Sequence, residues 1–268
     1  MTTPIISIEN VSKSFHVGNV DIPVLKKVTF DVAPGDFVII FGPSGCGKST
    51  LLHTILGLEP PNQGTILFLG DNLYERVNRT MVVEPSTLRH FIKNTYTIDE
   101  DERSEIRKRH IGMVYQQANW IKALTVAENI ALPFQLLEHA KSEALTKALE
   151  LLGTMNMTAW ANYIPSELSS GQQQKIALLR ALVTDPEVII ADEPTGNLDY
   201  ESGQELMQVL SKMNTMLHKT ILMVTHDLEY LKFAKIAVKM FNGEIAGVYK
   251  DGEKGALLQE VKGKRGRE

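Results

Sequence analysis

Cysteine is almost absent from this 268-residue chain, in which Cys46 stands alone. A single cysteine excludes an internal disulfide and a zinc site built from cysteines, and it is typical of a reducing compartment. Excess positive charge is also missing, since 28 Lys and Arg stand against 32 Asp and Glu, for a net charge of −4. A broad basic face for nucleic acid is therefore not expected.

Long apolar runs are missing as well. No run reaches the roughly 18–20 residues that a membrane-spanning helix needs. The first residues, MTTPIISIEN, have neither the basic start nor the apolar core of a secretory signal. We therefore expect a chain that works outside the bilayer, in the cytoplasm. Its 43% hydrophobic and 22% charged residues are those of an ordinary globular protein.

Short apolar runs open the sequence at residues 5–11, 24–32 and 37–41, and they predict strands. The run at 37–41 is continuously apolar, as in a parallel strand covered on both faces. It leads directly into the glycine-rich segment 42–50, after which apolar residues recur at helical spacing up to Gly57. Strand, glycine-rich loop and helix indicate an α/β nucleotide-binding fold.

The same alternation returns later in the chain. Helical patterns cover residues 141–152 and about 171–183. Two further apolar runs, at 188–191 and 221–224, are each followed at once by polar residues, and residues 204–217 between them have a helical pattern. This order predicts a right-handed crossover between parallel strands.

Two segments do not follow this scheme. Residues 74–110 hold an acidic run and then a basic run, and we interpret them as a surface insertion. The basic residues at 262–267 predict a disordered tail, with weak attraction to anionic lipid as the alternative.

Residues 42–49 match the phosphate-binding pattern G-x-x-x-x-G-K-[ST] in full. Glycines let successive backbone amides turn toward phosphate oxygens, and the following helix presents its positive end to the same anion. Lys48 supplies a cation for the β- and γ-phosphates, and Ser49 offers a hydroxyl to Mg²⁺.

Two acids, Asp192 and Glu193, follow the apolar run 188–191. A carboxylate at the carboxyl end of a buried parallel strand lies where such sheets bind ligands. Asp192 can hold Mg²⁺ directly or through water, and Glu193 can polarise an attacking water as a general base. Alone, this pattern is also that of an acidic turn after a strand.

Four further positions each leave two interpretations open. Ser169 or Ser170 caps the helix at 171–183, or this helix start serves a nucleotide held by another copy of the protein. Gln116 and His226 follow apolar runs at the same end of the sheet as Asp192, and each is either a site residue or an ordinary surface residue. Phe15 either stacks on an adenine ring or belongs to the core.

Taken together, the spacing resembles that of ATP-binding cassette (ABC) ATPase subunits along nearly the whole chain. The family's motifs occur in its own order: an aromatic residue at Phe15, Walker A at 42–49, the Q-loop at Gln116, the signature at 168–172, Walker B at 188–193, the D-loop ending at Asp199, and the switch His226. Residues 172–174 and 194–199 further resemble the lipoprotein-release and macrolide-export group. Ser170 departs from the family, which usually has glycine there.

The resemblance implies a P-loop core with a parallel sheet, an N-terminal antiparallel β-subdomain and a helical subdomain at about 117–180. The ATPase domain would span 1–250, with the insertion at about 74–110 and a tail at 251–268. The catalytic residues would be Lys48, Glu193 and His226, and the Mg²⁺ ligands Ser49, Gln116 and Asp192. The ATP contacts would be Phe15, Gly42, Pro43, Ser44, Gly45, Cys46, Gly47, Lys48, Ser49, Thr50, Gln116, Leu168, Ser169, Ser170, Gly171, Gln172 and Asp199.

By the same resemblance, the chain would pair with a second copy or a close relative and work on a separate membrane permease, at the inner face of the cell membrane. ATP and Mg²⁺ would be its cofactors, hydrolysis its reaction, and export or lipoprotein or peptide extrusion its purpose. Two alternatives remain at this stage: a regulatory ATPase of the cell-division type, and a soluble ABC ATPase acting on nucleic acid or ribosomes.

Overall fold

A mixed sheet lies at the centre of the computed structural model, which describes residues 3–74, 76–78, 95–97 and 100–255. Its strand order is β12-β11-β3-β10-β9-β8, and every neighbouring pair is parallel except β11 and β12. The strands are β3 (Phe37–Phe41), β8 (Ile111–Tyr115), β9 (Val188–Asp192), β10 (Thr220–Thr225), β11 (Ile236–Phe241) and β12 (Glu244–Lys250). The expected α/β fold with a parallel sheet is confirmed.

Residues of β3 alternate between two cores, which explains why the strand is apolar throughout. Val38 and Ile40 belong to the core that contains helix α1 (Lys48–Ile55), while Phe37 and Ile39 face the core that contains α6 (Tyr200–Leu217). Helices on both faces leave no side of the strand for polar residues.

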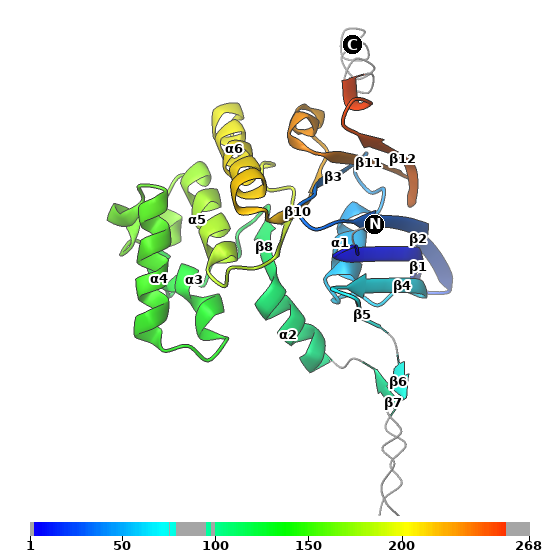
Figure 1. Ribbon diagram of the computed structural model, residues 1–268, viewed down its shortest axis with the longest axis horizontal. Coiled ribbons are helices and arrows are strands. Elements are labelled where there is room, and N and C mark those ends of the chain that lie inside the picture. Colours follow the sequence, from blue (N-terminus) through cyan, green and yellow to red (C-terminus); the bar gives the residue numbers. More distant parts are fainter. Residues whose placement is uncertain (1–2, 75, 79–94, 98–99, 256–268) are drawn as a thin grey trace, which may run out of the picture.

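An antiparallel sheet lies against α1 (Figure 1), with the order β2-β1-β4-β5. Its strands are β1 (Ile6–Val17), β2 (Val20–Val32), β4 (Gln63–Phe68) and β5 (Asp71–Asn72). The β1–β2 hairpin extends further than the apolar runs at 5–11 and 24–32 suggested, because backbone pairing continues out to Val17 and Val20. The side chains of this outer part are largely exposed, so hydrophobicity does not mark it.

Three helices form a group with its own core, on the far side of β8 from the antiparallel sheet (Figure 1). They are α3 (Val126–Gln135), α4 (Lys141–Thr154) and α5 (Ser170–Leu182), joined by short 3₁₀ turns at Thr158–Trp160 and Pro165–Glu167. Thr125 caps α3 in a capping box with Glu128, which fixes where this helix begins.

Helix α2 (Glu100–His110) runs directly into β8. Its first turn is acidic and its last turn is basic, the arrangement that a helix dipole favours. Before it, β6 (Arg76–Asn78) pairs with β7 (Thr95–Thr97). Residues 79–94 of the expected insertion lie outside the described residues.

A 3₁₀ helix, η3 (Leu228–Phe233), connects β10 to the last two strands, β11 and β12. Residues 251–255 are described, and the buried Lys254 donates to the carbonyl oxygen of Ala234. The basic tail at 262–267 lies outside the described residues. None of the helices in the described ranges is long and apolar enough to cross a membrane.

Candidate functional site

Strand register brings the polar residues of the candidate site to one edge of the central sheet. Asp192 lies opposite both Tyr115 of β8 and Val224 of β10, and Phe41 of β3 lies opposite Thr225. All four strands are parallel, so the segments that follow them start at the same edge. The first residues of these segments are Gly42, Gln116, Glu193 and His226.

The loop after β3 passes so close to its neighbours that glycine is required. A Cβ on Gly42 would lie 2.2 Å from the carbonyl oxygen of Met240. Gly47 has φ = 103°, and a Cβ there would lie 2.8 Å from the carbonyl oxygen of Val24. The backbone amides of the loop are thus left without side chains in front of them, which suits a phosphate-binding loop. Between these glycines lie Pro43, Ser44, Gly45 and Cys46.

Lys48 is the first residue of α1, and its side chain is buried against the loop. Its ammonium donates to the carbonyl oxygens of Gly42 at 2.9 Å and Pro43 at 3.1 Å. These bonds keep the charge at the concave side of the loop, within reach of an anion held there. Ser49 and Thr50 follow in the first turn of the helix.

Ser49 and Asp192, two of the expected Mg²⁺ ligands, come from different segments of the chain and contact each other. The Ser49 hydroxyl donates to Oδ1 of Asp192 at 3.4 Å. Burial raises the pKa of the Asp192 carboxyl. The charge of His53 lowers that pKa, and the charge of Glu193 raises it. In the described part of the chain, no group of three or more His, Cys, Asp or Glu is able to hold a metal ion. A hydroxyl and a carboxylate suit Mg²⁺, which commonly takes its remaining ligands from phosphate and water.

Glu193 and His226 make a close pair across neighbouring strands. Oε2 of Glu193 lies 2.7 Å from Nδ1 of His226. The Glu193 amide donates to the carbonyl oxygen of Val224 at 2.9 Å, and its backbone has φ = 46°. A positive φ is strained for glutamate and is typical of residues held in place for function.

Gln116 contacts the segment that follows Glu193. Its Nε2 donates to Oδ1 of Asn197 at 3.4 Å, and Nδ2 of Asn197 donates to the carbonyl oxygen of Gln116 at 3.3 Å. Gly196 makes room for this contact, since a Cβ there would lie 2.6 Å from Nε2 of Gln116. Gly196 and Asn197 lie in the segment 194–199 that carries the family resemblance, but a turn of Thr, Gly and Asn has no local sign of a distant partner such as Gln116.

Ser169 is the N-cap of α5, and its hydroxyl accepts from the amide of Gln172 at 3.3 Å. The Gln172 side chain in turn accepts from the amide of Ser169, which completes a capping box. Ser169, and not Ser170, is therefore the capping residue. Leu168 is buried before it, and Gly171 lies against the Ser202 hydroxyl of α6.

Asp199 caps α6 in the same way. Its Oδ1 accepts from the amide of Ser202 at 2.9 Å and its Oδ2 from the Ser202 hydroxyl at 2.8 Å. These hydrogen bonds lower the pKa of the exposed Asp199 carboxyl. The starts of α5 and α6 therefore lie side by side, because Ser202 contacts both Asp199 and Gly171.

The start of α5 is separate from the glycine-rich loop. No hydrogen bond in the described ranges joins residues 168–172 to residues 42–50. In Figure 1, α5 lies with α3 and α4, while α1 lies on the other side of β8 with the antiparallel sheet. One chain alone does not bring these two helix starts onto one phosphate group.

Phe15 lies on the outer part of the β1–β2 hairpin, opposite Ile22. Its side chain is 37% exposed, and the Lys13 ammonium lies 5.0 Å from the ring centroid. The ring is therefore not a core residue of the described fold.

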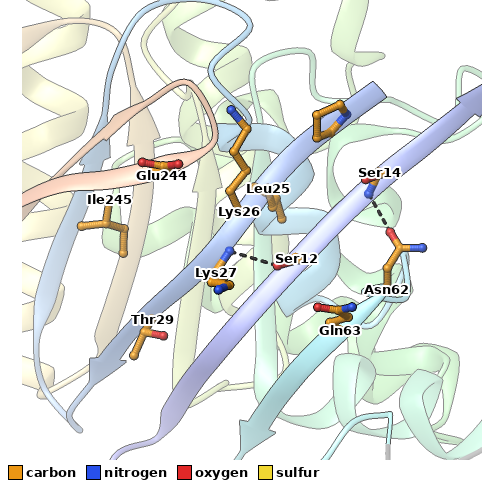
Figure 2. A pocket seen from close by; sticks show the side chains of 11 residues that line it. Ser12, Ser14, Leu25, Lys26, Lys27, Thr29, Asn62, Gln63, Glu244 and Ile245 are labelled. Carbon is orange, nitrogen blue, oxygen red and sulfur yellow. Dashed lines mark hydrogen bonds between the residues drawn. The ribbon is translucent and has the colours of Figure 1, made fainter. Parts of the chain in front are cut away.

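A hollow of about 840 Å³ lies on the antiparallel sheet (Figure 2), and its lining residues Ser14 and Pro23 are next to Phe15 and Ile22 on the β1–β2 hairpin. Strand β2 contributes Lys26 and Lys27 to its wall, and the Lys27 amide donates to the Ser12 hydroxyl. None of the expected ATP contacts lines it.

The glycine-rich loop, the buried lysine and the paired acids define a P-loop ATPase. The family model described as "ABC transporter" matches residues 25–196, and the chain belongs to the ABC transporter family as one of its ATP-binding cassettes. It is an ABC-type ATPase.

Relatives with this architecture are similar over nearly the whole chain. An uncharacterized ABC transporter ATP-binding protein from Methanocaldococcus jannaschii is 37% identical over 91% of this chain and 98% of its own length. A second such protein from that organism is 37% identical over 90% of this chain and 94% of its own. The structure of this second cassette, described as dimeric and post-hydrolysis with ADP and Pi bound, matches with a TM-score of 0.76, covering 91% of this chain and 98% of that one at 34% identity.

A macrolide export ATP-binding/permease protein, MacB from Wolinella succinogenes, is 35% identical over 91% of this chain. The match covers 34% of that longer protein.

Proposed function

We propose that this chain is the ATP-hydrolysing subunit of a membrane complex, in which ATP closes a pair of cassettes and a separate permease uses the motion. The observation that carries the proposal is the meeting of Ser49, Asp192, Glu193 and His226 at one edge of the sheet. These groups come from three separate segments of the chain, and together they supply the parts that phosphoryl transfer needs.

The loop at 42–47 binds the phosphates through its backbone amides, and Lys48 leaves its carbonyl partners to contact the β- and γ-phosphate oxygens. Ser49, Asp192 and Gln116 hold Mg²⁺, which when bound neutralises phosphate charge. Phe15, exposed on its hairpin, stacks on the adenine ring.

Glu193 is the general base that takes a proton from the attacking water. His226 holds the Glu193 carboxylate by donating through Nδ1, and its Nε2 donates to the γ-phosphate when the imidazole is protonated, because only the imidazolium donates through both ring nitrogens. The hydrogen bond thus links the group that senses the phosphate to the group that activates water.

The second half of the ATP site comes from another copy. Ser169–Gln172 begin α5 with amides and a positive helix end, which attract an anion. ATP bound between the start of α5 in one chain and the glycine-rich loop of its partner places phosphate charge between two positive helix ends. Without ATP these two helix ends would repel each other. The dimeric form of the Methanocaldococcus jannaschii cassette supports this arrangement. Asp199, next to Gly171 through Ser202, lies at the same interface.

The permease is a separate chain at the inner face of the cell membrane, where this protein binds peripherally. The name of MacB joins an ATP-binding part and a permease in one polypeptide, and this chain matches about a third of it. This supports export, of a lipoprotein, a peptide or a small molecule. We assign residues 1–250 to the ATPase domain, with the helical subdomain at about 117–180 making the contact with the permease.

Two measurements test the proposal. Purified protein should release phosphate from ATP only with Mg²⁺ present. Tagged protein expressed in its source cells and solubilised in mild detergent should co-purify with a multi-span membrane protein, and adding that protein should change the rate. Absence of Mg²⁺-dependent hydrolysis by protein that binds ATP would overturn the enzymatic part. A soluble nucleic-acid complex in place of the membrane protein would overturn the transport part.

A further inference from the structure

Tyr230 is a buried tyrosine of η3, the 3₁₀ helix that begins two residues after His226. Its side chain is 5% exposed and belongs to the core under α6, together with Leu206 and Met207. A tyrosine in such a core needs a partner for its hydroxyl, because an unpaired buried hydroxyl is costly. The surroundings of this hydroxyl show which parts of the chain it joins.

Gly203, near the start of α6, leaves the space in which the Tyr230 hydroxyl lies. A Cβ on Gly203 would lie 2.3 Å from the hydroxyl oxygen and 3.4 Å from Cζ of the same ring. The first distance is a clash, whereas the second is an ordinary contact. The Gly203 amide also donates to the carbonyl oxygen of Asp199 at 2.9 Å. The tyrosine hydroxyl therefore lies against the turn of α6 that Asp199 caps.

Thr195, two residues after Glu193, lies at the same point of α6. Its Cβ is 3.8 Å from the place that a Cβ on Gly203 would take, and the residue is buried. Burial raises the pKa of the Tyr230 phenol, and a hydrogen bond between the side chains of Tyr230 and Thr195 lowers it. The Tyr230 hydroxyl thus joins the turn after β9 to the 3₁₀ helix after β10.

Two side-chain contacts therefore connect the same two segments of the chain. Glu193 and His226 are the first residues after β9 and β10, and their side chains lie 2.7 Å apart. Thr195 follows Glu193 by two residues, and Tyr230 follows His226 by four. One contact lets two segments turn about it, whereas a second contact further along fixes their relative orientation. Side chains that do chemistry need such support from the residues behind them.

We propose that Tyr230 is a positioning residue for hydrolysis, whose hydroxyl ties the turn after Glu193 to the helix after His226 and to the start of α6. The inference rests on the proposed roles of Glu193 and His226, and it adds the residue that keeps them in place. Tyr230 is buried, so it acts on the reaction only through these segments. A misplacement of about 1 Å can lower a rate about 100-fold, so a bond remote from the substrate can still set kcat.

Tyr230→Phe is the first test, because it removes the hydroxyl and keeps the ring in the core. We expect kcat for ATP hydrolysis to fall about fivefold or more, while the Kd for MgATP, measured by calorimetry, stays within about twofold. Thr195→Val removes the other hydroxyl at a similar size and should give a similar fall in kcat. Since both changes break the same bond, the double variant should fall no further than either single variant.

Tyr74→Phe is the matched control, because it also removes a hydroxyl that is bonded inside the fold. The Tyr74 hydroxyl donates to the carbonyl oxygens of Thr54 at 2.8 Å and Glu59 at 3.1 Å. These three residues lie outside β9, β10 and the segments that follow them. The control should lose thermal stability, as a broken hydrogen bond does, at an unchanged kcat. All rates are measured well below the unfolding temperature of each variant.

Gly203→Ala separates the packing of Tyr230 from its positioning role. Alone, this change places a Cβ against the Tyr230 hydroxyl and should lower the unfolding temperature. Combined with Tyr230→Phe, the clashing oxygen is gone, and the unfolding temperature should exceed that of Tyr230→Phe alone because alanine favours a helix over glycine. The kcat of this double variant should stay low, because the bond to Thr195 is still missing.

A wild-type kcat in Tyr230→Phe, or an equal fall in Tyr74→Phe, would overturn the inference. So would a loss of ATP affinity as large as the loss of kcat, because the hydroxyl would then support the nucleotide site as a whole. Recovery of kcat when Gly203→Ala is added to Tyr230→Phe would overturn it too, since packing alone would then set the rate. Unchanged hydrolysis in Glu193→Gln would contradict the proposed function, whereas a wild-type kcat in Tyr230→Phe beside an inactive Glu193→Gln would contradict only this inference.

Discussion

Nδ1 of His226 lies 2.7 Å from Oε2 of Glu193, and the two residues follow neighbouring parallel strands of the central sheet. An ionised carboxylate only accepts hydrogen bonds, so the imidazole must donate through Nδ1. Nε2 is then the ring atom that can face a ligand. The strained backbone of Glu193, with φ = 46°, is held by a hydrogen bond from its amide to the carbonyl oxygen of Val224 of β10. The pair is thus fixed at both the backbone and the side chain.

Changing Glu193→Gln should retain ATP binding, stop turnover and accumulate closed dimer. The amide keeps the size of the side chain and its contact with His226, but it cannot accept a proton from water. We expect a fall in kcat of at least about 100-fold, which is the contribution typical of a general base. Phosphate release measures the rate, and size-exclusion chromatography with MgATP measures the dimer.

Glu150→Gln, on the exposed face of α4, is the control for that experiment and should keep the wild-type rate. Unchanged hydrolysis in Glu193→Gln would remove this residue as the base. Loss of ATP binding in that variant would instead point to damage to the loop at 42–50.

Changing Lys48→Ala should weaken nucleotide binding strongly. The ammonium that now bonds to Gly42 and Pro43 is lost, and with it the charge nearest to the phosphate loop. Charge-assisted hydrogen bonds to phosphate contribute about 1.5–3 kcal/mol each, so ATP affinity should fall roughly 100-fold. Calorimetric titration with MgATP checks this, with Lys212→Ala on the exposed face of α6 as control. Wild-type affinity in Lys48→Ala would defeat the phosphate-loop assignment.

Changing Asp192→Asn should stabilise the protein without nucleotide while abolishing Mg²⁺-dependent hydrolysis. Burial raises the pKa of Asp192 above its ordinary value, so the ionised form is less favourable in the folded chain than in the unfolded chain. At pH 7 the folded state therefore carries that cost, and removing the charge should raise the free energy of unfolding. Thermal or urea unfolding at pH 7 measures it.

The pH dependence of that gain has a fixed sign. As pH falls through the folded-state pKa of Asp192, the carboxyl becomes neutral and the advantage of the asparagine variant should shrink. Asp71→Asn, at an exposed position, is the control. It should change the free energy of unfolding by no more than about 0.5 kcal/mol, both at pH 7 and at a pH below the folded-state pKa of Asp192. A variant Asp192→Asn that is less stable than wild type at pH 7 would show that the bond from Ser49 outweighs the burial of charge.

Several elements of the fold follow from local sequence. Strands β3, β9 and β10 are short apolar runs because helices cover both faces of the sheet. The glycine-rich loop follows β3, and the polar residues Glu193 and His226 follow β9 and β10 directly. Sequence also gives the order of these segments along the chain. Strand register, which decides whether Asp192 lies beside Val224, depends on backbone pairing between distant segments and leaves no local pattern.

Sequence placed the start of α6 too late. Helix α6 begins at Tyr200, before the expected start at Gln204, because Asp199 caps it and polar residues form its first turn. The contact of Gln116 with Asn197 was not foreseen, since each residue alone is an ordinary polar side chain.

Gly196→Ala tests whether the contact between Gln116 and Asn197 matters for turnover. The added Cβ would lie 2.6 Å from Nε2 of Gln116, so this flexible side chain must move away. Stability should change little, because only a side-chain end is displaced, whereas kcat should fall about tenfold or more since Gln116 is a proposed Mg²⁺ ligand. Gly153→Ala on α4 is the matched control: its Cβ meets only the Thr158 hydroxyl, at 3.9 Å, and alanine should stabilise that helix by up to about 1 kcal/mol at unchanged kcat. A wild-type rate in Gly196→Ala would show that Gln116 reaches its working position by another route, and that its bond to Asn197 belongs to the fold alone.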